Sequence, residues 1–199
     1  MVTQYEYVDL GLPSGLKWAK CNIGAEKETD YGYYFQWGDI VDKSNADCSW
    51  ATYKHCNGSD TTMKKYNSES YYGIVDNIET LEAKDDAATQ IMGGNWRMPT
   101  KAELQELTDY TTNEWTQVNG VNGYKFTSKK EGYQNNSIFI PAAGYRLGSS
   151  FHSQGNYGEV WTSSVVNSNA STLHFGLDDF TPDSEESRCY GLSVRGVFK

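Results

Sequence analysis

Residues 99–110 read PTKAELQELTDY and contain the clearest structural signal of the chain. Thr100 and Glu103 have the spacing of a capping box, in which each side chain bonds the backbone N–H of the other residue at the start of a helix. Leu104, Leu107 and Tyr110 then recur at every third position and share one face. The sequence therefore predicts a helix over 100–110, with Thr100 and Glu103 as caps and not as catalytic groups.

A second, shorter helix is predicted just before this one, over residues 80–91. Its apolar positions are Leu81, Ala87, Ala88 and Ile91. The pair Gly93-Gly94 provides a stop, because glycine accepts the left-handed backbone that ends many helices. The pair Asp85-Asp86 is expected in the first turn, where negative charge is favourable to the helix dipole.

Segments with the character of strands flank the two helices. Residues 7–19 predict two short strands around the turn Pro13-Ser14-Gly15. After Trp115 the predicted strands are 124–126, 137–141, 160–162, 173–177 and 192–198. Within 173–177, alternation places Leu173, Phe175 and Leu177 on one inward face, so that His174 and its neighbour Thr172 point outward. Strands that surround two helices indicate an α+β fold with an antiparallel sheet.

Charge and composition exclude several classes of protein. The 199 residues include 17 Lys and Arg against 26 Asp and Glu, and the formal net charge is −9. Nucleic acids and anionic bilayers are therefore disfavoured as partners. No apolar stretch approaches the roughly 20 residues that span a membrane, and the first residues have no signal-peptide character. We expect one domain over 1–199, with a polar, irregular insert at about 42–72.

The four cysteines decide little about the chemistry. Cys21, Cys48, Cys56 and Cys189 can pair in three ways, and a chain of this size folds without disulfides. Cys48, His55 and Cys56 resemble half of a zinc site, but no second half accompanies them. We therefore expect no metal and no cofactor.

Seven short motifs, spread over nearly the whole chain, resemble those of the Fibrobacter succinogenes major paralogous domain family. They are 8–25 (VDLGLPSGLKWAKCNIGA), 34–38 (YFQWG), 85–88 (DDAA), 95–104 (NWRMPTKAEL), 141–146 (PAAGYR), 161–164 (WTSS) and 193–197 (SVRGV). The resemblance implies a C-type-lectin-like fold, with two helices packed on a small twisted antiparallel sheet and long irregular loops. It also gives structural roles to motif residues, which are Trp96, Arg97, Pro99, Thr100, Glu103, Trp161 and Arg195. We expect Arg97 and Arg195 to be buried anchors.

The same resemblance implies a setting and a kind of function. The segment 96–103 looks like the helix start of formylglycine-generating-enzyme-like proteins. The implied fold is similar to that of the variable proteins of diversity-generating retroelements, which present a changeable ligand surface near their C-terminus. Family members from gut Bacteroidetes resemble surface lipoproteins and adhesin tips, and related domains occur in phage. The expected location is extracellular, on a cell surface or on a virion surface.

Enzymatic and calcium-dependent roles lack the residues that they need. An oxidase of the formylglycine-generating type requires a close cysteine pair in the C-terminal half, where only Cys189 occurs. The histidines His55, His152 and His174 share no metal-ligand spacing. The Glu-Pro-Asn or Gln-Pro-Asp triplet of calcium-dependent sugar binding is absent, although Asp178 and Asp179 are acidic and loop-like. We expect a protein that is not an enzyme.

The region 145–191 is the best candidate for a ligand-binding surface. Aromatic, arginine and asparagine side chains are concentrated between its strands, and such residues dominate recognition surfaces. The predicted ligand-binding residues are Tyr145, Arg146, Phe151, His152, Tyr157, Asn167, Asn169, His174, Asp178, Asp179, Phe180, Arg188 and Tyr190. They favour an adhesin or receptor module that binds a surface glycan or a protein by stacking and hydrogen bonding.

Three alternatives remain: a structural subunit of a fimbria or of a phage virion, a retroelement-diversified variable protein and, least favoured, an enzyme of the formylglycine-generating type. The second is disfavoured because only three of the fourteen asparagines, Asn156, Asn167 and Asn169, lie in 150–199. Adenine-directed diversification tends to start from asparagine codons.

Overall fold

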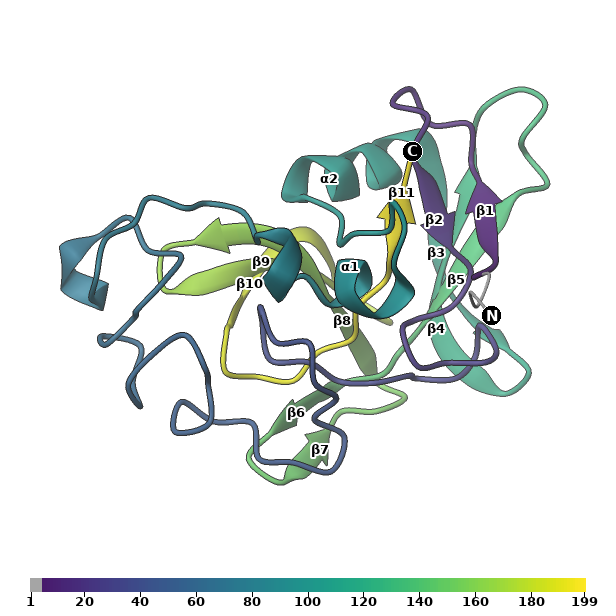
Figure 1. The fold of residues 1–199 in the computed structure, drawn as a ribbon. Helices are drawn as coiled ribbons and strands as arrows, with labels where there is room; N and C mark the ends of the chain where they lie inside the picture. The colour runs from purple at the N-terminus through teal and green to yellow at the C-terminus, as the bar shows by residue number, and fades with distance from the viewer. Residues whose placement is uncertain (1–4) are drawn as a thin grey trace.

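The computed structural model describes residues 5–199, and the helix predicted from the capping box forms as α2 (Lys101–Tyr110) (Figure 1). The Glu103 backbone N–H donates to the Thr100 hydroxyl at 3.3 Å, and the Thr100 N–H donates to the Glu103 carboxylate at 2.9 Å. Leu104 and Leu107 are buried in the core. Tyr110, the last residue of the helix, is 50% exposed and does not join them.

The second predicted helix is shorter than expected and is divided in two. A 3₁₀ turn, η2 (Ala83–Asp85), precedes α1 (Ala87–Met92), and Asp86 separates them with an extended backbone. The Thr89 N–H donates to the Asp86 carboxylate at 2.9 Å, so Asp86 is the N-cap of α1 and not a residue of its first turn. Gly93 ends α1 with φ 71°, as predicted.

Within the described residues, the strands form four small antiparallel sheets. In spatial order they are β1 (Tyr7–Asp9), β2 (Lys17–Ala19) and β11 (Val197–Phe198); β3 (Thr111–Val118), β4 (Val121–Ser128) and β5 (Ser137–Pro141); β10 (Phe180–Ser187), β9 (Asn169–Gly176) and β8 (Tyr157–Val166); and β6 (Tyr145–Leu147) with β7 (Ser150–His152). The α+β class predicted from the sequence is confirmed. In Figure 1, α2 lies on the opposite side of the molecule from the β6–β7 hairpin.

Two long strands, β3 and β10, were not predicted. Both are edge strands, so each pairs on one side only, and both are rich in polar residues. The predicted strand at 192–198 is also corrected, because only its last part is β11. Before it the chain makes single bridges, from Leu192 to Phe35 and from Ser193 to Val160.

Both faces of the β8–β9 pair are buried at its centre. Val160, Leu173 and Phe175 belong to a first core cluster, which also contains the buried leucines of α2. Trp161 and Ala170 belong to a second cluster on the opposite face, together with residues of α1. Two predictions for this strand are therefore corrected: Thr172 is fully buried beneath the second cluster, and Leu177 lies beyond the strand with 68% exposure.

The motifs that carry the family resemblance interlock through tryptophan side chains. The Trp161 indole N–H donates to the Phe35 carbonyl at 2.7 Å, and the Trp37 indole N–H donates in return to the Thr162 carbonyl at 2.8 Å. Pro99 accepts the Ser163 backbone N–H at 2.8 Å, which fixes the start of α2 against β8. Trp96 is partly buried and packs edge-on against Phe198, with ring centroids 4.5 Å apart.

Arg195 is an anchor, as predicted, and it joins three segments of the chain. It is fully buried, and its guanidinium donates to Asn22 Oδ1 at 2.9 Å and to the carbonyls of Ala19 and Phe139, both at 3.0 Å. Arg97 differs from its prediction. It pairs with Glu103 at 2.5 Å, but its side chain remains 37% exposed.

The insert at 42–72 is irregular, as predicted, and it is packed against the remainder of the chain. It contains a one-turn 3₁₀ helix, η1 (Ser70–Tyr72). The insert follows the outer edge of the molecule before the chain returns to α1 (Figure 1). Tyr53, Cys56 and Met63 form a third core cluster with Cys189. All four cysteines are free thiols. Within residues 5–199, no helix has the length and the apolar character needed to cross a bilayer.

Arg195→Ala should lower the free energy of unfolding by about 3–5 kcal/mol, because it leaves buried carbonyls without donors and opens a cavity. Urea denaturation followed by tryptophan fluorescence measures the change. Arg97→Ala is the matched control and should cost about 1 kcal/mol or less, since its ion pair is partly solvated. Equal losses in the two variants would contradict the anchoring role of Arg195.

Candidate ligand-binding site

Five of the predicted ligand-binding residues form one row of rings, which we call the aromatic row: Tyr145, His152, Tyr157, His174 and Tyr190. Tyr145 lies at its centre. Its ring centroid is 5.1 Å from that of His152, 6.0 Å from that of Tyr157 and 5.4 Å from that of Tyr190, with interplanar angles of 18°, 20° and 9°. His174 extends the row at 5.0 Å from Tyr157. All five are partly exposed.

Strand register brings these rings together from distant parts of the sequence. Tyr145 is opposite His152 in the β6–β7 hairpin, and Arg146 bridges Gly191, which places Tyr190 beside Tyr145. The hairpin meets β8 at the bridge between Gly144 and Gly158. A Cβ at Gly144, where φ is 63°, would lie 2.0 Å from the His152 carbonyl oxygen, so glycine is required for this approach.

The carboxylates of Glu159, Asp179 and Glu186 lie near the row, and the His174 imidazole contacts the first two of them. His174 Nδ1 lies 3.1 Å from Glu159 Oε1, its cross-strand partner, and His174 Nε2 lies 3.1 Å from Asp179 Oδ2. The bond to Glu159 raises the pKa of His174 above its ordinary value. Burial and the nearby Glu159 charge raise the pKa of Glu186. Glu159 itself is only 5% exposed.

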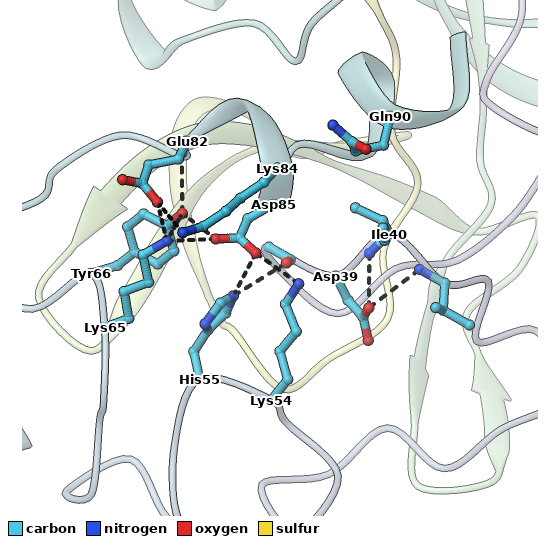
Figure 2. A network of polar contacts seen from close by, with 12 residues as sticks. Asp39, Ile40, Lys54, His55, Lys65, Tyr66, Glu82, Lys84, Asp85 and Gln90 are labelled. Atoms are coloured by element: carbon cyan, nitrogen blue, oxygen red, sulfur yellow. Dashed lines mark hydrogen bonds and ion pairs between the residues drawn. The ribbon is translucent and has the colours of Figure 1, made fainter. Parts of the chain in front are cut away.

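A second polar cluster, around Asp85, has a different charge pattern (Figure 2). The Asp85 carboxylate accepts hydrogen bonds from Lys54 at 2.9 Å, from Lys65 at 2.6 Å and from the Tyr66 hydroxyl at 2.7 Å. Lys65 also binds Glu82. Every carboxylate in this cluster has an ammonium partner, so we interpret it as the anchor that holds the insert against the turn before α1.

The surroundings of the aromatic row contain no such partner. Residues 131–198 include seven acidic residues and no lysine. Their three arginines, Arg146, Arg188 and Arg195, are 5%, 0% and 0% exposed and are directed to backbone carbonyls. Lys101 reaches this region from α2, where it pairs with Asp183 at 2.7 Å. Among the described residues, Glu159 has no ion-pair partner other than His174, and Glu186 has none.

Two predicted binding residues, Arg146 and Arg188, are corrected because their guanidinium groups are enclosed. Arg146 Nε donates to the Ala46 carbonyl at 2.8 Å. Arg188 Nε donates to the Asn169 carbonyl at 2.9 Å, and the guanidinium lies 5.0 Å from the Trp37 ring centroid. Burial lowers the pKa of Arg188. Arg188 is 0% exposed, holds the scaffold and is closed to a ligand, whereas Arg146 is 5% exposed and its Nε is held by the scaffold.

The remaining predicted residues lie outside the row. Asn167 and Asn169 are at the far end of the β8–β9 hairpin, where Asn169 pairs with Val166. Phe180 stacks on Tyr124 at 4.7 Å and packs against the first core cluster, so it is corrected to a structural residue. Phe151 is 41% exposed and contacts Tyr34. Asp178 is exposed in the turn that precedes Asp179.

Sequence reasoning did not select Glu159 or Glu186 for the site. Tyr157 and Glu159 are two positions apart in β8, so their side chains share one face of the strand. This spacing could be read from the sequence. Glu186 lies in β10, which was not predicted as a strand. Its proximity to the row depends on pairing with β9.

The half zinc motif does not form a site. The His55 ring is turned to the Gly38 carbonyl at 3.3 Å, and the Cys56 thiol donates to the Trp50 carbonyl at 3.3 Å. Burial lowers the pKa of His55 to about 4. In residues 5–199, no group of three or more His, Cys, Asp and Glu side chains is placed to hold a metal ion.

The geometry defines a partly exposed aromatic surface with carboxylates of its own, and among the described residues of 131–198 the arginines are almost fully buried. Comparison with known proteins gives no match, whether to family models, to curated proteins or to solved structures.

The contribution of His174 to stability should depend on pH. Because its folded pKa is raised above the unfolded value of about 6.5, its stabilisation is complete below that value and is lost as pH rises through the folded pKa. His174→Gln should therefore lower the free energy of unfolding more at pH about 5.5 than at pH about 8.5. Urea denaturation at both pH values tests this. The difference should shrink in a Glu159→Gln background, where only Asp179 still faces the imidazole, and an unchanged difference there would contradict the pairing.

Asp85→Asn should destabilise the protein by about 2–3 kcal/mol at neutral pH, because it leaves Lys54 and Lys65 without their shared carboxylate. The folded pKa of Asp85 lies well below its usual range, so the stabilisation is present above the unfolded pKa of about 3.9 and is lost as pH falls. Thermal denaturation at pH 7 measures it. Glu69→Gln, which removes an exposed carboxylate of the same insert, should change little. An equal loss in that control would exclude an anchoring role.

Proposed function

We propose that the protein is a non-catalytic binding module that presents the aromatic row to an external glycan or protein. The observation that carries the proposal is the row itself, five partly exposed rings beside carboxylates that lack Lys or Arg partners. Rigid aromatic side chains bury a large area at small entropic cost, and their hydroxyl groups supply hydrogen bonds. Unpaired charge at a partly buried surface costs stability, which a ligand would recover.

We further propose a C-type-lectin-like fold and membership of the Fibrobacter succinogenes major paralogous domain family. The support is that residues of several motifs act as framework. Trp37, Trp161 and Arg195 are fully buried and bond to distant backbone carbonyls. Such a family assignment favours a location outside the cell, on a cell or virion surface.

The chemistry of the reactive side chains supports a role without catalysis. Burial raises the pKa of Cys189 to about 11, so its thiol is not a ready nucleophile. Both imidazole nitrogens of His174 already contact carboxylates, which leaves no free position for a general base. These groups are better suited to holding a surface in shape.

A structural subunit of a fimbria or virion is the second candidate, and one observation favours it. Tyr71, Ile74 and Val75, in and after η1, are 74%, 63% and 42% exposed. Exposed apolar residues of this kind mark contacts with other chains. A retroelement-diversified variable protein would use the same C-terminal surface as the binding module.

Tyr190→Ala should weaken binding to the ligand by about tenfold or more, because it removes the ring that stacks on Tyr145 at the centre of the row. A screen of glycan and surface-protein arrays with the wild type identifies the ligand, and titration of the hit with the variant measures the loss. Tyr71→Ala is the matched control and should bind normally. A hit lost only with Tyr71→Ala, or concentration-dependent oligomers lost with it, would favour the structural subunit instead.

A further inference from the structure

We propose that the aromatic row recognises an arginine side chain of a protein partner. This inference rests on the proposed function and names the chemical class of its ligand. The guanidinium would lie against the plane of a tyrosine of the row and pair with Glu159 and Glu186. It would supply the positive charge that this part of the chain does not supply itself.

Glu159 is almost fully buried, and only one of its two carboxylate oxygens has a hydrogen-bond partner. Its Oε1 contacts His174, whereas its Oε2 accepts no hydrogen bond from any described residue. Although Oε2 lacks a partner, it is not fully enclosed, so it is in contact with solvent. A carboxylate that is 95% buried and has one oxygen in contact with solvent keeps an acceptor for a donor from outside the chain.

Charge complementarity then selects the class of ligand. The segment 131–198 contains seven acidic residues and no lysine, and its three arginines are buried. Lys101, which enters from α2, pairs with Asp183, and Lys43 of the insert pairs with Asp39. A sulfated or otherwise anionic ligand would be repelled by such a surface, and a cation would be attracted to it.

The stacked rings favour arginine over other cations. A guanidinium is planar, stacks on aromatic faces and donates two parallel N–H bonds to a carboxylate, whereas an ammonium is a compact, strongly hydrated point charge. Tyr145 is nearly parallel to Tyr190, His152 and Tyr157, with interplanar angles of 9°, 18° and 20°, so four of the five rings share one orientation, whereas His174 is tilted by 44° from Tyr157. The scaffold itself uses this type of contact, since Arg146 lies 4.6 Å from the Phe151 ring centroid and Arg188 lies 5.0 Å from that of Trp37.

The test is an array of short random peptides, each printed with arginine, with lysine and with citrulline at the same positions. Citrulline keeps the shape of arginine and removes its charge. Partly deacetylated and fully acetylated chitin oligosaccharides form a second arm, in which the cation is an amino sugar. The best peptide is then labelled with fluorescein and titrated by fluorescence anisotropy against the full chain.

The matched pair of variants is Glu186→Gln and Glu185→Gln. The two residues are neighbours in β10 and point to opposite faces, so both changes remove one charge and only Glu186 is on the side of the row. We expect Glu186→Gln to weaken arginine-peptide binding by about tenfold and Glu185→Gln by less than about twofold. Thermal denaturation of both variants establishes that they are folded.

Three results would overturn the inference. Citrulline or lysine peptides that bind as well as arginine peptides would remove the guanidinium from the explanation. Equal losses for Glu185→Gln and Glu186→Gln would indicate general acidity and not this site. Selective binding of deacetylated chitin would identify a different class of partner. If arginine peptides fail while a neutral ligand from the earlier screen is lost with Tyr190→Ala, the binding module stands and only the arginine specificity is wrong.

Discussion

The guanidinium of Arg195 is the point at which the two ends of the protein and one of its central sheets are joined. It is fully buried and has no carboxylate partner among the described residues. Its N–H groups donate hydrogen bonds to the carbonyls of Ala19 at the end of β2, of Lys20 after it and of Phe139 in β5. A further hydrogen bond goes to the Asn22 side chain. Burial lowers its pKa to about 10, and it still carries its charge at neutral pH. Five N–H donors in a fixed plane can satisfy several carbonyls at once, which lysine cannot do.

What could be predicted from the sequence was mostly local. The capping box of α2 involves residues three positions apart, and the structure confirms it. The end of α1 at Gly93 is likewise a property of one backbone position. Arg195 and Trp161 were assigned to the framework through the family resemblance, and their burial is confirmed.

What could not be predicted depends on pairing between distant segments. Strand β10 has a polar sequence and exists because β9 lies beside it. Arg146 and Arg188 looked like surface residues, but carbonyls of Ala46 and Asn169 enclose them from other parts of the chain. Five aromatic residues predicted from one region of the sequence do lie together, yet their order in the row follows from the bridges at Gly144 and Gly191. Glu159 becomes significant only once its strand partner His174 is known.

The framework of this protein is bonded mainly to backbone carbonyls, with the Asn22 side chain as a further acceptor of Arg195. Arg195 and Arg188 donate to carbonyls, and so do the indoles of Trp37 and Trp161. A carbonyl is the same whichever residue bears it, so these bonds place no demand on the identity of the loop residues that they hold. Residues of the surface can therefore be exchanged during evolution at little cost to folding. For the proposed binding module, such a framework would let the ligand preference change while the architecture stays constant.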